Sequence, residues 1–397
     1  MEIESFRALL TDEGQTLLAE LRGLAPGQEL AVATRLRRSH PAELVSAAIG
    51  QAGLRQRAAA KFGPADAQRM YFTPDGVEQA TRTSVAEWRA ARFRALGVRR
   101  IADLCSGVGG DAIALARAGI EVLAVDRDPL TCAVAEANAA ALGLDGLIRQ
   151  HCGDVAEIGL SGFDAVFVDP ARRGGRGGGG KGRIFDPEAY SPPLSWAVGA
   201  AGKTRYAALK VAPGIPHTAV PEGTEAEWVS DGGDVKEAVL WFGTDPDPAE
   251  PHRATLLPGG TCLTGGRLPD PEPGPVLRYL YEPDGAVIRA HLVAEAAERL
   301  DATLIDPTIA YLTSATLRQT PYATAYEITD TLPFGLKKLK ALLRERGVGT
   351  VVIKKRGSAI EPEALRRRLK PEGPHSCTVF LTRAAGAPVM LLGQPVR

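Results

Sequence analysis

The segments Ile101–Ala112 (IADLCSGVGGDA) and Val122–Asp126 (VLAVD) decide the fold. The first begins as an apolar strand, turns at Gly107 and Gly109, and continues into an alanine-rich helix. The second is another apolar strand, and its last residue lies about twenty residues beyond the first glycine. This order of strand, glycine turn, helix, strand and acid is typical of a nucleotide cofactor site in a doubly wound parallel sheet.

Two further acids distinguish between the cofactors that such a site can hold. The glycines alone also fit a nicotinamide or flavin dinucleotide. Asp103, at the end of the first strand, and Asp111, at the start of the helix, would both repel a pyrophosphate. S-adenosylmethionine (SAM) has no phosphate and carries an ammonium and a sulfonium, which carboxylates attract. The sequence therefore predicts a SAM site formed by Asp103, Gly107 and Gly109, in which Asp126 binds the ribose hydroxyls.

The composition excludes several classes of protein. The chain has 397 residues, enough for two or three domains with their own cores. Its five cysteines are scattered and its six histidines lack metal-ligand spacing, so we expect a reducing compartment and no metal. The N-terminus lacks a secretion signal, and no stretch is long enough to span a bilayer. We therefore expect a cytoplasmic protein that does not act at membranes.

Periodicity divides the first two thirds of the chain into two parts. Residues 1–75 have leucines at helical spacing, which predicts an N-terminal helical region. Residues 76–245 alternate strands and helices after a helix expected over 77–96. The expected strands are 100–105, 120–126, 148–152, 165–169 and 206–211, followed by a hairpin of 227–230 with 236–242. A parallel sheet closed by such a hairpin predicts an α/β, Rossmann-like, seven-stranded sheet of the class I methyltransferase type.

The last third differs in composition. Residues 246–276 are rich in Pro, Gly and Asp, which predicts a linker. Residues 277–397 are expected to form a separate α+β domain. Its expected helices are 287–300, 337–346 and 361–369, and its expected strands are 350–354, 377–382 and 388–392.

The end of the fourth strand carries the candidate catalytic residues. Ligands of such sheets bind beyond the carboxyl ends of the strands, where Asp169-Pro170-Ala171-Arg172 would face the transferable methyl group. Enzymes that methylate exocyclic amines often have Asn or Asp here, followed by two prolines and an aromatic residue. This chain keeps the acid and the first proline only, which weakens that interpretation. We expect Asp169 to orient the acceptor or take its proton, and Arg172 to hold a phosphate or a base.

Three neighbouring features are more ambiguous. Residues 172–183 carry five positive charges among glycines, which fits either a clamp on a phosphate backbone or a disordered insertion. Asp154 follows the weak third strand, where a methyltransferase binds the adenine amino group. Lys210, at the end of the fifth strand, fits either a substrate contact or an ion pair with a strand-end acid. Carbon-5 methylation of pyrimidines requires a thiolate, and no cysteine closely follows the fifth strand.

The C-terminal part is strongly basic although the chain as a whole is neutral. Between residues 337 and 370, twelve Lys and Arg face three acids, an excess of nine positive charges. Such asymmetry is typical of a nucleic-acid surface. Arginines 35, 37, 38, 55 and 57 add a second basic group, which fits a solvated helical face or a further contribution to nucleic-acid binding.

The chain resembles bacterial class I SAM-dependent methyltransferases with a C-terminal THUMP-like domain. The resemblance is carried by residues 72–81 (FTPDGVEQAT), 103–111 (DLCSGVGGD), 125–126, 169–172 (DPAR) and the basic stretch around 354–357. The cofactor segment is also similar to trimethylguanosine synthase enzymes, in which a Thr-Pro turn helps to hold SAM. That resemblance implies a cofactor role for Thr73. THUMP domains bind RNA in modification enzymes, so the resemblance implies the same for the C-terminal domain.

These observations predict a SAM-dependent methyltransferase that modifies a nucleotide in structured RNA, either tRNA or rRNA. Two alternatives remain open from the sequence. The substrate could be a protein or a small molecule, or the chain could be an RNA-binding module with a vestigial SAM pocket.

Overall fold

The computed structural model describes residues 1–172 and 186–396. The chain forms two compact units, Met1–Thr224 with Ala238–Asp245, and Glu225–Glu237 with Pro246–Arg397. The basic glycine-rich run of the sequence lies outside the described residues from position 173 onward.

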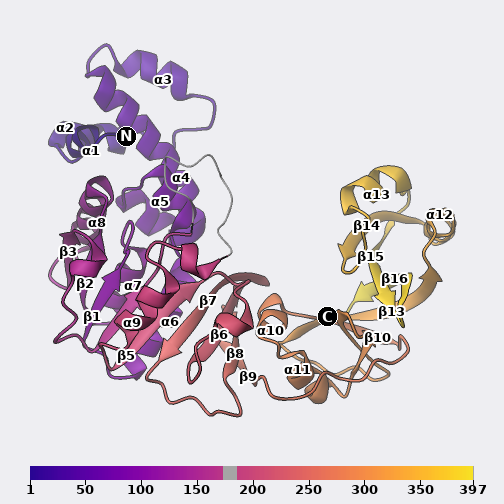
Figure 1. Ribbon diagram of the computed structural model, residues 1–397. Coiled ribbons are helices and arrows are strands. Elements are labelled where there is room, and N and C mark those ends of the chain that lie inside the picture. Colours follow the sequence, from indigo (N-terminus) through magenta and orange to yellow (C-terminus); the bar gives the residue numbers. More distant parts are fainter. Residues whose placement is uncertain (173–185, 397) are drawn as a thin grey trace. The chain divides into compact units, whose positions relative to one another are not determined.

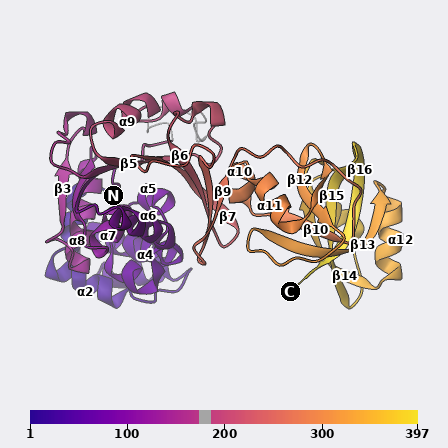
Figure 2. The ribbon, with the colours of Figure 1, turned by 90° about the horizontal axis from the view of Figure 1, so that it is seen from below.

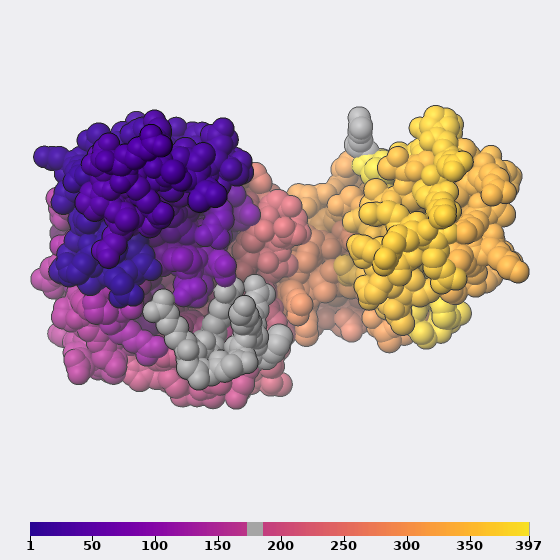
Figure 3. Space-filling view, turned by 90° about the horizontal axis from the view of Figure 1, so that it is seen from above, coloured from indigo at the N-terminus to yellow at the C-terminus, as the bar shows by residue number. Residues whose placement is uncertain are grey.

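The N-terminal region is helical, as predicted. Its helices are α1 (Ile3–Leu9), α2 (Asp12–Glu20), α3 (Glu29–Leu36) and α4 (Ala42–Arg69). They form the indigo part of the surface in Figure 3. The arginines of this region differ in role: Arg55 is buried, donates to the Met70 carbonyl at 2.8 Å and stacks on Tyr71, whereas Arg35 lies in an exposed pair with Glu20. Arg55 is therefore structural and does not belong to a basic surface.

The single helix expected over 77–96 is interrupted. The structure has α5 (Pro74–Gln79) and α6 (Thr83–Ala95), because the chain leaves the helical conformation at Ala80. Thr81 lies in this break, and its hydroxyl donates to Asp111 at 2.8 Å. A continuous helix would have kept that hydroxyl near its own backbone.

The central sheet of the first unit is parallel, as predicted (Figure 1). Its strands are β1 (Arg100–Leu104), β2 (Glu121–Asp126), β3 (Ile148–Cys152), β4 (Ala165–Val168) and β5 (Tyr206–Val211), and β7 (Asp234–Phe242) pairs antiparallel with β5. Helices α6, α7 (Gly110–Arg117) and α8 (Pro129–Leu142) lie on one face, and α9 (Leu194–Ala201) lies on the other (Figure 2). With β6 (Glu225–Asp231) next to β7, the strand order β3-β2-β1-β4-β5-β7-β6 confirms the class I methyltransferase sheet.

The predicted linker over 246–276 contains regular structure instead. β8 (His252–Leu257) pairs parallel with β6 (Glu225–Asp231), and β9 (Thr261–Gly265) pairs antiparallel with β8. The strand order continues past β6 with these two strands. The sequence concealed them because they are short and are flanked by the Pro, Gly and Asp residues that suggested a linker.

The C-terminal part forms the predicted α+β domain, but with more strands than expected. A seven-stranded sheet has the order β11-β12-β10-β13-β16-β15-β14. Its strands are β10 (Tyr279–Pro283), β11 (Thr303–Asp306), β12 (Ile309–Ser314), β13 (Ala323–Pro333), β14 (Val348–Lys355), β15 (His375–Ala384) and β16 (Ala387–Pro395). The sequence missed the first four. In β13 only Tyr326 is buried, so the strand lacks the alternation of apolar and polar residues that identifies half-buried strands.

The helix expected over 287–300 is also two helices. They are α10 (Gly285–Arg289) and α11 (Val293–Leu300). The chain turns between them at His291, whose φ of 57° is left-handed and cannot belong to a helix.

Two basic helices cover one face of the C-terminal sheet. Leu339 and Leu343 of α12 (Leu336–Glu345) and Leu365 and Leu369 of α13 (Pro362–Leu369) share a core with Val379 and other residues of β14, β15 and β16. The apolar side of each helix is thereby buried. The charged residues of both helices remain on their exposed sides.

A buried asparagine joins the N-terminal segment to the cofactor loop. The Asn138 side chain of α8 accepts a hydrogen bond from the Tyr71 amide at 2.6 Å and donates to the carbonyls of Tyr71 and Val108 at 3.0 and 2.9 Å. Asn138 is fully buried. Removal of the side chain would take away the partners of three buried backbone groups, and each unpaired group costs free energy.

We therefore expect Asn138→Ala to lower the free energy of unfolding by about 2–4 kcal/mol, measured by urea denaturation. Glu136→Ala changes an exposed residue of the same helix and is the control, with an expected change below about 0.5 kcal/mol. Equal stability of the two variants would contradict this role for Asn138.

Candidate functional site

The glycine turn after β1 has the backbone conformation that close approach of a ligand requires. Cys105, Gly107 and Gly109 have φ values of 67°, 57° and 89°, all left-handed. The Asp126 carboxylate at the end of β2 accepts from the Gly107 amide at 3.1 Å and from the Asp128 amide at 3.0 Å. The predicted ribose-binding acid is thus oriented by the same turn. The left-handed conformation of Cys105 was not predicted, because glycine usually occupies such a position.

Asp103 is the most unusual group of the site. Its side chain is fully buried, and among the described residues neither of its carboxylate oxygens has a hydrogen-bond partner. Burial, reinforced by the neighbouring charges of Asp111 and Asp169, holds the pKa of Asp103 well above its ordinary value. The Ser106 hydroxyl is also buried with no partner among these residues. A buried carboxylate without partners is costly, and a cationic ligand would compensate it.

A chain of buried hydrogen bonds connects the cofactor helix to the end of β4. Arg89 of α6 donates to Asp111 of α7 at 3.2 Å, and the Thr81 hydroxyl donates to the other Asp111 oxygen at 2.8 Å. The Lys210 ammonium of β5 donates to Thr81 at 2.8 Å and to Asp169 Oδ2 at 2.6 Å. Of the two roles that the sequence left open for Lys210, the structure therefore has the ion pair.

The charge balance of this region fits SAM. Three carboxylates, Asp103, Asp111 and Asp169, surround two cations, Arg89 and Lys210, which leaves one excess negative charge when all five are ionised. SAM has an ammonium, a sulfonium and one carboxylate, so its net charge is positive. A pyrophosphate would add negative charge to this site. The residues present therefore fit SAM and disfavour a dinucleotide.

The remaining predicted site residues lie in less distinctive surroundings. Thr73 caps α5 by accepting from the Gly76 amide at 2.9 Å, and Asp154 accepts from the Ala156 amide at 2.8 Å. Asp154 follows β3, whose last residue pairs in register with Asp126, so both acids lie at the same edge of the sheet. Arg172 lies just beyond the bridge that joins Ala171 to Ser191 and is half-buried.

Sequence reasoning missed two residues of the site, Thr81 and Arg89. Both are far from the glycine turn in the chain, and no spacing rule relates them to Asp111. Arg89 is buried, and its guanidinium lies 4.4 Å from the centre of the Phe167 ring. A buried arginine can be located only when the acid that neutralises it is known.

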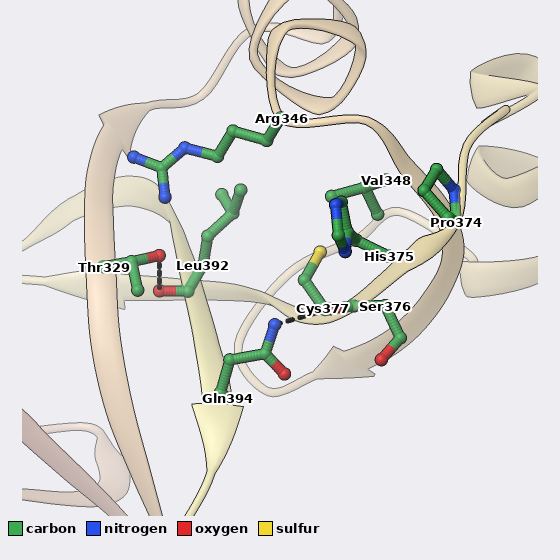
Figure 4. A pocket seen from close by; sticks show the side chains of 9 residues that line it. All are labelled: Thr329, Arg346, Val348, Pro374, His375, Ser376, Cys377, Leu392 and Gln394. Carbon is green, nitrogen blue, oxygen red and sulfur yellow. Dashed lines mark hydrogen bonds between the residues drawn. The ribbon is translucent and has the colours of Figure 1, made fainter.

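A separate pocket of about 470 Å³ lies in the C-terminal unit (Figure 4). Three of its polar residues pair within the protein. Arg346 pairs with Asp330 at 2.6 Å, the Thr329 hydroxyl donates to the Leu392 carbonyl, and the Gln394 amide donates to the Ser376 carbonyl. We assign no chemistry to it.

Comparison with known proteins shows the family. An uncharacterized SAM-dependent methyltransferase of Mycobacterium tuberculosis strain H37Rv is 33% identical over 339 residues, covering 83% of this chain and 90% of the relative. The chain belongs to the SAM-dependent methyltransferases. SAM is therefore its methyl donor. A crystal structure from Porphyromonas gingivalis W83, of a protein provisionally named a methyltransferase, has a TM-score of 0.75 at 22% identity and covers 94% of this chain and 100% of that one, which supports the fold.

Shorter similarities concern individual parts of this methyltransferase. Family models match residues 323–395 as THUMP domain-like, residues 98–180 as RNA cap guanine-N2 methyltransferase, and residues 2–58 as DUF8688, a domain of unknown function. The 23S rRNA (uracil(1939)-C(5))-methyltransferase of Shewanella amazonensis is 41% identical over 80 residues, 19% of this chain and 18% of that enzyme. The predicted THUMP-like domain is confirmed.

Two kinds of feature are absent from the described residues. None of the helices they form is both long and apolar enough to cross a membrane. They also contain no group of three or more His, Cys, Asp or Glu residues that could hold a metal ion.

The raised pKa of Asp103 predicts that SAM binding depends on pH. Its carboxyl stays protonated in the folded protein at pH values where the unfolded chain has lost the proton, so its contribution to stability is present below the unfolded pKa, about 4, and is lost as pH rises through the raised pKa. A bound cation favours the carboxylate. SAM binding should therefore release a proton. As pH rises toward the raised pKa of Asp103, the affinity for SAM should increase by up to about tenfold per pH unit.

Calorimetry in buffers of different ionisation enthalpy measures this proton release. Asp103→Asn should abolish it and weaken SAM binding, whereas Asp75→Asn, at an exposed position, should preserve both. Proton release that persisted in Asp103→Asn would contradict the assignment.

Proposed function

We propose that this methyltransferase modifies RNA, and that its C-terminal domain binds the RNA through the exposed sides of α12 and α13. The observation that carries the proposal is the distribution of charge on these helices. Their apolar sides are buried against the sheet, and every basic residue of both is exposed: Lys337, Lys338, Lys340, Arg344, Arg366, Arg367 and Arg368. The THUMP domain-like match over 323–395 includes both helices and supports this role.

The basic surface does not include every basic residue of this part of the chain. Lys354 pairs with Glu282, and Arg356 lies 4.0 Å from the same carboxylate and stacks on Tyr311. Both are half-buried. They are therefore positioned to stabilise the domain, and α12 and α13 are the better candidates for phosphate contacts.

We further propose that the methyl acceptor is an exocyclic amine of a base. Asp169 lies at the end of β4 with one oxygen held by Lys210, and a carboxylate oxygen can accept a hydrogen bond from an N–H group. The similarity of residues 98–180 to RNA cap guanine-N2 methyltransferase supports this acceptor. The chain lacks the aromatic residue that such enzymes use to stack the base, so cap guanosine itself is not proposed.

The cysteines do not support carbon-5 chemistry. Cys105 is the cysteine of the glycine turn, next to the site acids. Burial, with added repulsion from Asp126, Asp169 and Asp103, raises the pKa of its thiol far above the ordinary value. A thiol that stays protonated is a poor nucleophile. Cys105 is therefore a poor candidate for the nucleophile that carbon-5 methylation requires.

The mechanism then consists mainly of positioning. SAM supplies an activated methyl group on sulfur, and the electron pair of the broken carbon–sulfur bond remains on that sulfur. Asp103 and Asp126 hold the donor. Asp169 accepts a hydrogen bond from the N–H group of the acceptor amine and so directs the nitrogen lone pair toward the methyl group. As the new bond forms, Asp169 receives the proton that the nitrogen loses. Arg172 contacts the base or its phosphate.

RNA binding is tested by removing the three charges of α13. We expect Arg366→Gln with Arg367→Gln and Arg368→Gln to weaken binding of total tRNA or rRNA. The dependence of log Kd on log salt should become shallower by about 0.7–0.9 for each phosphate that the variant no longer neutralises. Fluorescence anisotropy over a salt series measures both effects.

The matched control removes three exposed arginines of the N-terminal region, Arg35, Arg37 and Arg38, by the same substitution. Equal weakening by both triple variants would contradict α12 and α13 as the specific RNA surface, whether the N-terminal arginines bind RNA themselves or act by general charge.

The acceptor is tested by transferring isotopically labelled methyl groups to total RNA from source cells that lack the gene. Mass spectrometry of the digested nucleosides should find the label on an exocyclic nitrogen. Asp169→Asn should reduce the rate about 100-fold while the Kd for SAM changes little, because the amide presents N–H groups in place of an acceptor oxygen. Label on a base carbon or a ribose oxygen would overturn the amine, and labelled protein without labelled RNA would overturn the RNA substrate.

A further inference from the structure

Lys210 is a buried lysine whose partners include Asp169 and Thr81. It lies near the end of β5, its side chain is only 5% exposed, and it donates to Asp169 Oδ2 and to the Thr81 hydroxyl at 2.6 and 2.8 Å. An ammonium is rarely buried to this extent unless it is paired. Asp169 and Thr81 belong to two separate segments, the strand end after β4 and the break between α5 and α6.

The Thr81 hydroxyl has a fixed direction in this arrangement. A hydroxyl has a single hydrogen, and Thr81 donates it to Asp111. Thr81 can therefore only accept from Lys210, which is always a donor. Arg89 donates to the second oxygen of Asp111 and holds that carboxylate on the other side. Hydrogen-bond direction thus runs from Lys210 through Thr81 to the first turn of α7.

The same lysine determines which way Asp169 faces. With Oδ2 taken by the ammonium, Oδ1 is the oxygen that remains for a substrate, on a side chain that is 23% exposed. Without Lys210, Asp169 would lose the bond that holds Oδ2 and would lie near Asp103 and Asp111 with one cation fewer to balance them. A shift of about 1 Å in a reacting geometry can cost about 100-fold in rate.

We propose that Lys210 is a positioning residue for methyl transfer. It holds Asp169 in the orientation that faces the acceptor. Through Thr81 and Asp111 it also fixes the position of Asp169 relative to α7, the helix that follows the glycine turn. This inference rests on the proposed function. Lys210 acts through Asp169 and does not itself contact the transferred methyl group.

Four variants test the proposal in the full-length protein, with total RNA from gene-deleted cells as substrate. Lys210→Met should lower kcat by about 10- to 100-fold. The KM for RNA and the Kd for SAM should stay within about threefold of wild type, and Lys210→Arg should recover part of kcat. Thr81→Val removes only the hydroxyl and should lower kcat, whereas Thr81→Ser retains it and should not. The threonine pair keeps the test valid if Lys210→Met fails to fold.

A double variant separates positioning from a general structural role. Because Lys210 acts through Asp169, adding Lys210→Met to Asp169→Asn should lower kcat by less than about threefold more. If the two losses multiply, Lys210 acts independently of Asp169 and the proposal is overturned. It is also overturned if Lys210→Met transfers methyl groups at the wild-type rate, or if its kcat loss is matched by an equal loss of SAM affinity.

Failure of the proposed function would look different. In that case wild-type protein binds SAM and transfers no methyl group to RNA, and the inference falls with the function on which it rests. If wild type is active and the Lys210 and Thr81 variants equal it, only the inference fails.

Discussion

The site depends on the cost of burying carboxylates at the ends of parallel strands. Asp111 and Asp169 lie close enough to Asp103 to reinforce the effect of burial in raising its pKa, and Arg89 and Lys210 each pair with one of these two neighbours. A buried charge is tolerated only with a partner, so the protein must either supply cations or bind one. Two carboxylates are paired internally. The third, Asp103, has no partner among the described residues, and a positively charged ligand would compensate its carboxylate.

Segments that are far apart in the chain meet at the cofactor site of the first unit and supply partners for its buried polar groups. Thr81 lies in a break between two helices, and that break brings a hydroxyl to Asp111. Asn138 holds the Tyr71 backbone and the Val108 carbonyl of the glycine turn. The segments that precede β1 in the chain therefore help to hold the cofactor loop in place. Their loss would expose backbone groups that the site needs in fixed positions.

In the C-terminal unit, the basic residues fall into a paired, half-buried group and an exposed group. Basic residues that lie next to Glu282 are used within the domain, as Lys354 and Arg356 show, and those on the outer sides of α12 and α13 remain available to a partner. A count of charges along the sequence adds both groups together. Only their burial separates the residues that stabilise the domain from those that can bind phosphate.

The parallel sheet, the glycine turn, the use of SAM and the THUMP-like domain could all be predicted from the sequence alone. These follow from local patterns: apolar strands of regular spacing, left-handed turns that need glycine, and acids placed at strand ends. Sequence patterns missed β8 to β13, because most of these strands are short and β13 lacks alternation of apolar and polar residues, and they joined helices that are broken at Thr81 and His291. Only the tertiary structure decided that Lys210 pairs with Asp169 and that Arg89 pairs with Asp111. The two residues of each pair lie far apart in the chain and need each other because both are buried. A local sequence pattern does not contain that information.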